Sequence, residues 1–248
     1  MLGASTGLFA LLLHSVVDFN MHIPANAIVA VSLMALLSSH LRFATHGHWK
    51  TAASWTKGLA TLILLAGTIS LVAQGWCRAH EYVWLNRAGR ASYASPDQIA
   101  LLKKAFAIEP DNFETAYALG EAYRVESWEG NDHYAELAYQ AMEWYDRSLK
   151  LNPFYAEGWM RWGMCLDWLG RHEEAGRYFA RAERLDPNNN FIIAHMGWHY
   201  VQMGNYAAAR SWFERSLRLE SQNNLIARSY LEITKRRLVE GAAAVWPR

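Results

Sequence analysis

His14 and Asp18 form the pair of residues in this sequence whose types and spacing best suit chemistry. They lie four residues apart, so a helix would place the imidazole and the carboxylate on one face, within hydrogen-bonding reach. A carboxylate in that position fixes the imidazole tautomer and raises its basicity. The pair belongs to the stretch HSVVDFNMHIPANA, residues 14–27, which also carries Asn20, His22 and Pro24.

This polar stretch lies between two apolar runs, where lipid is expected. Polar and ionisable groups inside a bilayer are costly, and where they occur they usually face protein or water-filled space. We therefore interpret residues 14–27 either as part of a functional site or as a polar cluster at headgroup level, where polarity costs little. The residues alone leave both interpretations open.

A second pair, His195 and His199, has the i, i+4 spacing of metal ligands on one helical face. No glutamate follows the first histidine as in the HExxH motif, and no third ligand is evident. Cys77 and Cys165 lack the CxxC spacing of a zinc site. We therefore expect neither a bound metal nor a cofactor.

The distribution of charge predicts a membrane portion, residues 1–77, followed by a water-soluble portion. Residues 1–41 contain one formally charged side chain, Asp18, and residues 58–77 contain none. Since a span takes about 20 apolar residues, we expect three spans, at about 2–18, 23–41 and 58–76.

The start of the sequence gives two further expectations. A cleaved signal peptide fits poorly, because the first basic residue is Arg42. The first span begins directly after Met1, so we expect the chain to be the C-terminal piece of a longer membrane protein. The net charge of +1 argues against a nucleic-acid partner.

Basic residues predict the orientation of the spans. The loop 42–57 holds Arg42, Lys50 and Lys57 and no acidic residue, so the positive-inside rule places it in the cytoplasm. Residues 14–26 and everything after Cys77 then lie on the outer side, in the periplasm.

The portion after Cys77 contains an internal repeat. Pro153, Pro187 and Ser221 are spaced 34 residues apart, and the pieces LKLNP, ERLDP and LRLES before them align. This pattern resembles the tetratricopeptide repeat. Its signature positions are filled by Trp159, Gly163, Ala175, Phe179, Ala182 and Pro187 in one copy, and by Ile193, Gly197, Tyr200, Ala209, Phe213 and Ser216 in the next.

We therefore expect an all-α protein with about three transmembrane helices, followed by the solenoid of helical hairpins that the resemblance implies for residues 78–240. An earlier, distorted copy carries nine extra residues, which we place in its hairpin turn. Ser95 and Gln98 form a capping box that opens the second helix of an incomplete first repeat. The segment 225–239 is expected to be a cap helix, and 241–248 a tail.

The inner face of such a solenoid is a candidate partner-binding groove. Counting along the repeat, the residues expected on it are Tyr117, Glu121, Met160, Met164, Asp167, Phe191 and Trp198. This face is aromatic, rich in methionine and mildly acidic, and it lacks the Lys/Asn cluster that clamps a peptide carboxylate in some relatives. It would hold a partner helix or peptide, or stack against a sugar ring. The alternative is that neighbouring helices bury these residues as core.

The N-terminal stretch resembles the O-antigen ligase/polymerase family of bacterial membrane proteins. The family signature HSxxDFxxxIPAN is matched by His14, Ser15, Asp18, Phe19, Ile23, Pro24, Ala25 and Asn26, with Asn20 and His22 inside it. The resemblance covers residues 1 to about 45. It implies a glycosyltransferase of the bacterial inner membrane that transfers undecaprenyl-diphosphate-linked glycans on its outer face.

In that reading His14 and Asp18 support a catalytic site whose main part lies upstream of the signature. The partners implied are the lipid bilayer, the rest of a multi-span transferase, and a protein or peptide in the groove. The chain alone is expected to be inactive. The alternative is a membrane-anchored adaptor with no catalytic activity, and the two differ in whether further spans precede Met1 in frame.

Overall fold

The structure, a computed structural model, describes residues 5–10, 29–37, 54–129 and 132–245. Regular structure in these ranges is helical, as expected. The chain divides into two compact units, Met1–Thr68 and Ile69–Arg248, and the boundary lies inside the long helix α3. The helices are α3 (Ser54–Ala88), α4 (Pro96–Ile108), α5 (Phe113–Trp128), α6 (Tyr134–Leu151), α7 (Ala156–Trp168), α8 (His172–Leu185), α9 (Asn190–Gln202), α10 (Tyr206–Leu219) and α11 (Leu225–Val245).

Among the described residues, α3 is the helix that is long and apolar enough to cross a membrane, judged by length and composition. Its apolar side chains are exposed, with Leu71 at 70% and Val72 at 67%. Of the other two predicted spans, the structure describes helix at 5–10 and 29–37, and their remaining residues lie outside the described ranges. The membrane-spanning role of all three segments stays a prediction.

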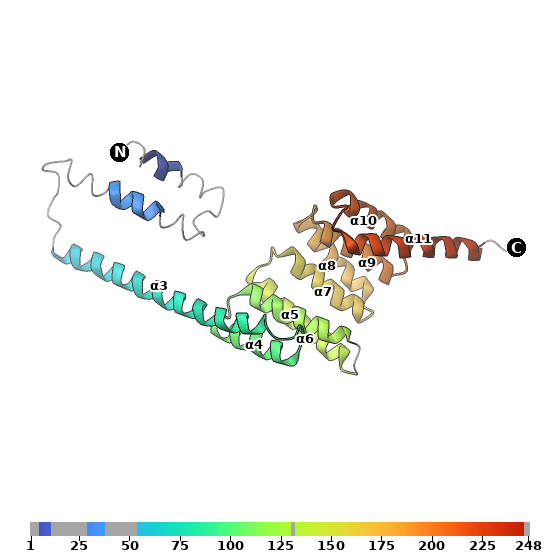
Figure 1. Cartoon of the computed structure of the whole chain (residues 1–248), viewed down its shortest axis with the longest axis horizontal. Coiled ribbons are helices and arrows are strands. Elements are labelled where there is room, and N and C mark those ends of the chain that lie inside the picture. The colour runs from blue at the N-terminus through green and yellow to red at the C-terminus, as the bar shows by residue number, and fades with distance from the viewer. Residues whose placement is uncertain (1–4, 11–28, 38–53, 130–131, 246–248) are drawn as a thin grey trace. The chain divides into compact units, whose positions relative to one another are not determined.

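The second unit is a stack of antiparallel helical hairpins (Figure 1). α5 pairs with α6, α7 with α8, and α9 with α10, and α11 packs on the last hairpin. Each hairpin crosses closely at a glycine, where an added Cβ would lie 2.6–2.8 Å from an aromatic ring of the second helix. The three pairs are Gly120 with Tyr145, Gly163 with Phe179, and Gly197 with Phe213.

The close crossing explains why the repeat combines a glycine with a large ring. Tyr145, Phe179 and Phe213 are all fully buried, so each ring occupies the volume that a side chain at the glycine would need. Gly170 and Gly204 lie in the turns between helices with φ of +74° and +70°, a backbone region that favours glycine.

Trp159 is partly buried and packs against the core of the second full repeat; its Nε1 donates to the Pro153 carbonyl at 2.9 Å, and its ring stacks on Trp162. One local prediction about the repeats needs correction. Most of the nine extra residues of the first full repeat lengthen its helices instead of its turn: α5 and α6 have 16 and 18 residues, against 13 and 14 in α7 and α8.

The first hairpin joins the end of α3 to α4. Ser95 caps α4 by accepting from the Gln98 N–H, and the Gln98 side chain accepts from the Ala94 N–H at 2.7 Å. The sequence predicted this capping box, although Gln98 reaches the residue before the cap. Gln98 also donates to the carbonyl of Ala88, the last residue of α3, and so fastens α3 to α4.

A buried carboxylate links α3 to the next hairpin. Glu81 is 5% exposed, and its Oε1 accepts from Asn112 Nδ2 and from Thr115 Oγ1, each at 2.7 Å. Asn112 in turn caps α5 through its Oδ1. Since removing a partner from a buried carboxylate is costly, Glu81 holds α3 in a defined position against α5.

Candidate functional site

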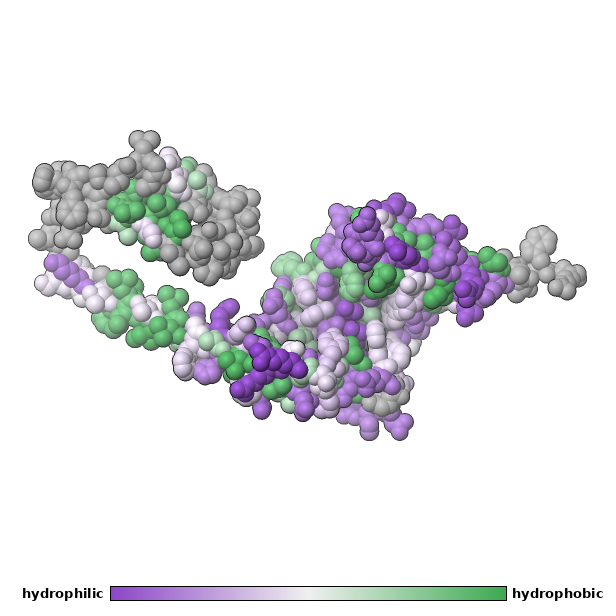
Figure 2. Space-filling model, viewed as in Figure 1, coloured by the Kyte–Doolittle hydropathy of each residue, from purple (hydrophilic) through white to green (hydrophobic). Residues whose placement is uncertain are grey.

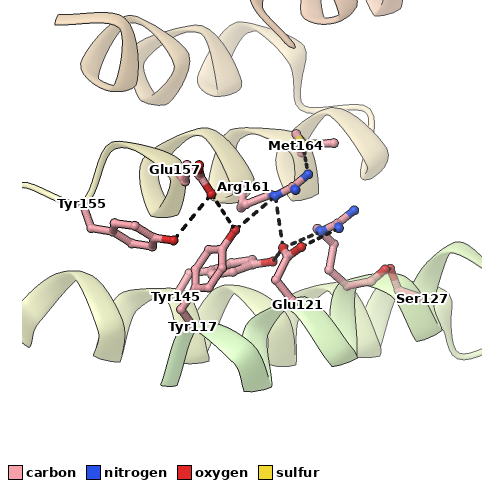
Figure 3. A network of polar contacts seen from close by, with 9 residues as sticks. Tyr117, Glu121, Ser127, Tyr145, Tyr155, Glu157, Arg161 and Met164 are labelled. Atoms are coloured by element: carbon pink, nitrogen blue, oxygen red, sulfur yellow. Dashed lines mark hydrogen bonds and ion pairs between the residues drawn. The ribbon is translucent and has the colours of Figure 1, made fainter. Parts of the chain in front are cut away.

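The candidate site lies where the first helices of successive hairpins meet. α5 contacts α7, and α7 contacts α9. Side chains that leave these helices on their shared side therefore come together although they lie about one repeat apart in sequence. Figure 3 shows this region, with the polar ends of Tyr117, Glu121, Tyr145 and Arg161 pointing toward one another.

The Glu121 carboxylate is the centre of the polar network. Arg124 binds it with two parallel hydrogen bonds of 2.9 Å, from Nε to Oε1 and from Nη2 to Oε2. Tyr145 donates its hydroxyl to Oε1, and Arg161 on α7 approaches the same oxygen with Nε at 3.2 Å. One carboxylate from α5 is thus shared by two arginines and a tyrosine from three different helices.

Arg161 connects the three first helices. Its Nε donates to the Tyr117 hydroxyl on α5 at 3.4 Å, and its Nη1 lies 3.3 Å from the Met164 sulfur. Its guanidinium also lies over the Phe191 ring of α9, 5.0 Å from the ring centre. A planar guanidinium can stack and donate at the same time, which a lysine cannot do.

The rim of the network is made of tyrosines and a carboxylate. Tyr117 and Tyr155 each donate to Glu157 Oε2 at 3.5 Å, and their rings meet edge to face with centres 5.0 Å apart. These three side chains are half-buried, so part of each reaches the surface. The accessible rim therefore offers aromatic faces and one acidic group.

Burial and charge set the protonation of the network. Burial raises the pKa of the Glu121 carboxyl, but the hydrogen bonds and positive charge of Arg124, with the charge of Arg161, outweigh it and hold that pKa below its ordinary value. Burial and the charge of Glu157 raise the pKa of Tyr155 to about 12. Near neutral pH the site therefore holds an ionised carboxylate beside neutral tyrosines.

Beside Tyr117 and Glu121 lies an open hollow of about 390 Å³. Its walls come from the first hairpin and from α5, and they are mostly apolar. Tyr93 stands at its edge with 66% of its surface exposed. The other residues around it are Leu85, Ala88, Gly89, Gln98, Leu102 and Ala118. A hollow of this size accommodates one or two side chains of a bound peptide.

The structure brings together some of the residues predicted for the groove and separates others. Tyr117, Glu121, Met164 and Phe191 contact one another or Arg161 in the network. Met160, Met164 and Asp167 are almost fully buried, at 0, 2 and 3% exposure, while Trp198 is half-buried. The binding role of all seven residues stays a prediction.

The two histidines of α9 have separate surroundings. His195 is buried, hydrogen-bonds the Phe191 carbonyl through Nδ1 at 2.8 Å, and has its pKa lowered to about 4, chiefly by burial. His199 instead hydrogen-bonds Asp167, which His172 also contacts, at 2.9 and 3.0 Å. In the part of the chain that the structure describes, no three His, Cys, Asp or Glu side chains are placed to hold a metal ion.

Four residues of the network were not predicted from the sequence: Arg124, Tyr155, Glu157 and Arg161. A signal for them exists: Glu157 and Arg161 are spaced i, i+4 on one helix, as Tyr117 and Glu121 are on another. The motif residues His14, Ser15, Asp18, Phe19, Asn20, His22, Pro24 and Asn26 lie outside the described residues.

This geometry defines a class of protein, a helical-hairpin solenoid with a polar and aromatic inner face. Profiles of the tetratricopeptide repeat match residues 156–189 and 192–223. The chain therefore contains tetratricopeptide repeats, as the 34-residue spacing predicted. A solved structure with the same fold, a thermophilic TPR protein of Thermus thermophilus, superposes with a TM-score of 0.52 at 20% identity, covering 56% of this chain and 72% of that one.

Two curated proteins show sequence similarity. Anaphase-promoting complex subunit 3 of Schizosaccharomyces pombe is 22% identical over 139 residues, which are 53% of this chain and 21% of that protein. An uncharacterized protein of Methanocaldococcus jannaschii is 40% identical over 42 residues, 17% of this chain and 49% of that protein. The chain thus spans about a fifth and about half of the lengths of these relatives.

Proposed function

We propose that the chain is a membrane-anchored adaptor whose repeats bind a protein segment along the first helices of the hairpins. The observation that carries this proposal is the open hollow beside Tyr117 and Glu121, next to a rim of Tyr155 and Glu157. Pockets that bind ligands are mostly apolar and carry a few fixed polar groups. Here the Glu121 network supplies the fixed groups, and the hollow supplies the apolar surface.

The proposed partner inserts an apolar side chain into the hollow and lays its backbone across the tyrosine rim. Tyrosines suit such contacts because they combine a large apolar face with a hydrogen-bonding end. α3 would tether this module to the membrane by its apolar length. Repeats that serve as interaction modules in other proteins support the binding role.

Site-specific photo-crosslinking in the full chain tests the proposal. A crosslinking amino acid at Tyr93, at the edge of the hollow, should give a discrete product with one protein. The same amino acid at Tyr139 on α6, which is 48% exposed and lies away from the hollow, serves as the control. Equal products from both positions would contradict a specific binding face.

A second test blocks the hollow. Ala118→Phe would fill it and should weaken binding of the crosslinked partner at least about tenfold, as expected when a central anchor pocket is lost. Ala107→Phe, at an exposed position on α4, is the matched control. Unchanged binding by the Ala118 variant, with helical content intact, would refute this use of the hollow.

A second candidate function is favoured by the signature at residues 14–26. In this candidate the chain is the C-terminal part of an O-antigen ligase-like glycosyltransferase of the bacterial inner membrane, with the repeats in the periplasm. His14 and Asp18 would support transfer of a lipid-linked glycan. The support is the sequence signature together with the basic loop 42–57.

The transferase candidate is tested in a full-length transferase that contains this segment. Asp18→Ala should reduce glycan transfer strongly, because the His14 imidazole would lose the group that orients it. Asp18→Asn keeps the shape of the side chain without its charge, and it should restore little of the glycan transfer that Asp18→Ala loses. Transfer at the wild-type rate in both variants, or a reporter fusion after Ala88 that is active only in the cytoplasm, would contradict this candidate.

A further inference from the structure

The first hairpin carries an excess of positive charge over negative charge. Residues 78–108 contain five Lys/Arg and two Asp/Glu, and one of the two acids, Glu81, is buried and already bonded to Asn112 and Thr115. The five cations are exposed, and within the described ranges none of them lies in an ion pair. They are Arg78, Arg87, Arg90, Lys103 and Lys104.

Most cations of the later hairpins, in contrast, lie in ion pairs. Arg124, Arg161, Arg171, Arg210 and Arg215 each have a carboxylate partner within 4 Å. Residues 109–219 contain 11 Lys/Arg and 17 Asp/Glu, so over residues 78–219 the positive excess is confined to the end of the solenoid that adjoins the apolar part of α3. An exposed excess of one sign attracts a surface of the opposite sign.

Part of this excess forms a cation–aromatic patch around Arg87, defined here as Tyr82, Trp84, Arg87, Arg90 and Lys104. Two cations lie over the Trp84 ring, Arg87 Cζ at 4.7 Å and Lys104 Nζ at 4.9 Å from its centre. Tyr82, Arg87 and Arg90 line a shallow hollow of about 190 Å³ beside it. Figure 2 shows the change along α3 from hydrophobic to strongly hydrophilic side chains where α4 lies beside it.

Distance along α3 brings this patch within reach of a membrane surface. Trp76, 68% exposed, closes the apolar run and suits the headgroup level, where tryptophan is enriched. With a rise of about 1.5 Å per residue, Trp84 lies about 12 Å and Arg87 about 16 Å beyond Trp76 along the helix axis. The headgroup layer is about 5–8 Å thick, and anionic surface charge acts over a further Debye length of about 8 Å.

We propose that the cation–aromatic patch docks on the anionic phosphate headgroups of the membrane that α3 anchors. With α3 upright, Trp84 and Arg87 lie beyond the headgroup layer but within the range of its anionic charge. A tilt of α3 brings Arg87, Arg90 and Lys104 to the lipid phosphates, and Trp84 and Tyr82 to the headgroup layer. This proposal rests on the proposed membrane anchorage of α3. It adds a second attachment, which lays the first hairpin on the bilayer and orients the groove relative to it.

The test uses the full chain reconstituted in two kinds of vesicle, phosphatidylcholine alone and a mixture with phosphatidylglycerol as the anionic lipid. A fluorophore is attached at Ala107→Cys on α4, in a Cys77→Ala background, since Cys165 is buried. Headgroup-quencher lipids report its proximity to the surface. Vesicle flotation first checks that the chain is anchored in both lipids, so failure of anchorage is distinguishable from failure of docking.

The expected result is quenching that increases with phosphatidylglycerol and falls in high salt. Each engaged cation raises the docked-to-undocked ratio about fivefold, so the triple variant Arg87→Gln, Arg90→Gln, Lys104→Gln should lose about a hundredfold. The matched control, Arg181→Gln, Arg184→Gln, Arg218→Gln, removes three cations of the solenoid that also lie outside the ion pairs of the described residues and should change nothing.

Two outcomes would overturn the proposal. In one, the anchored chain shows the same quenching in both lipids. In the other, the triple Gln variant and its control respond alike to phosphatidylglycerol. If instead a soluble polyglutamate peptide shifts the fluorescence and anionic lipid does not, the patch binds an acidic protein segment, and docking on lipid is refuted.

Discussion

Removing the Glu121 carboxylate should destabilise the solenoid more than removing Arg161, the arginine that joins α5, α7 and α9. Glu121 and Arg124 have side chains that are 13% and 5% exposed, and they form two hydrogen bonds of 2.9 Å. In Glu121→Ala the Arg124 guanidinium stays buried without its counter-charge. Such a loss costs about 3–5 kcal/mol.

The bridging arginine should cost less. Arg161 is 13% exposed and approaches Glu121 at 3.2 Å, but its removal leaves that carboxylate bonded to Arg124 and Tyr145. The loss in Arg161→Ala is then about 2 kcal/mol, the value of a hydrogen bond to a charged group. In the double variant Glu121→Ala, Arg124→Ala neither member of the pair is left without its counter-charge, so part of the combined single losses should return, while Arg161 and Tyr145 still lack their carboxylate partner.

The assay is urea unfolding of the full chain in detergent micelles, followed by far-ultraviolet circular dichroism. The comparison of single and double variants at positions 121 and 124 isolates their coupling, which we expect to be about 2–3 kcal/mol. The reasoning is refuted if Glu121→Ala costs no more than Arg161→Ala. It is equally refuted if the double variant is as unstable as the two single losses combined.

Three other predictions concern single positions. The pKa of His195 is about 4 in the folded protein and 6.5 in the unfolded chain, so between these pH values only the unfolded chain gains a proton at this position. The free energy of unfolding should therefore fall by roughly 2 kcal/mol from pH 7 to 5. Urea titrations of His195→Gln should lack this part of the fall. Gly197→Ala should cost about 1–2 kcal/mol in thermal melts, because its Cβ would lie 2.6 Å from the buried Phe213 ring. The control, Gly176→Ala on α8, places its Cβ at an ordinary 3.5 Å from the nearest side chain and should not destabilise the protein. Ser95→Ala should cost about 1 kcal/mol and speed amide exchange in α4 while leaving α9 unchanged.

The repeat architecture was predictable because its signals are local. A glycine with positive φ, as at Gly170, and a capping box at Ser95 are each specified within a few residues. The 34-residue spacing then fixed the order of the hairpins. The longer spacing of the first full repeat led to a wrong prediction, since spacing alone does not say whether extra residues extend a loop or a helix. Trp128 at the end of α5 contacts Trp168, and this contact favours helix.

The site was less predictable, because a first helix in this fold has more than one buried side. It packs on its own second helix and on the next first helix, so a stripe of apolar residues fits either contact. Met160 and Met164 were assigned to the groove on such a stripe and are buried. Arg161, which lies between them in sequence, is the residue that joins α5, α7 and α9. The buried role of the two methionines and the bridging role of Arg161 are told apart only by the position of the Glu121 carboxylate on α5, opposite Arg161 on α7.

Glu81 couples the C-terminal part of α3 to α5, the helix that carries Tyr117 and Glu121. A flexible linker between a membrane helix and a binding module would let the module turn freely, and the groove would have no fixed orientation. Here α3 continues into the first hairpin without a break, and Glu81 bonds to Asn112 and Thr115 at the start of α5. α5 is also the helix that carries Tyr117 and Glu121. In the proposed adaptor, a partner bound at that site would be coupled to α3 through one buried carboxylate and one helix, and the direction in which it faces would be restricted.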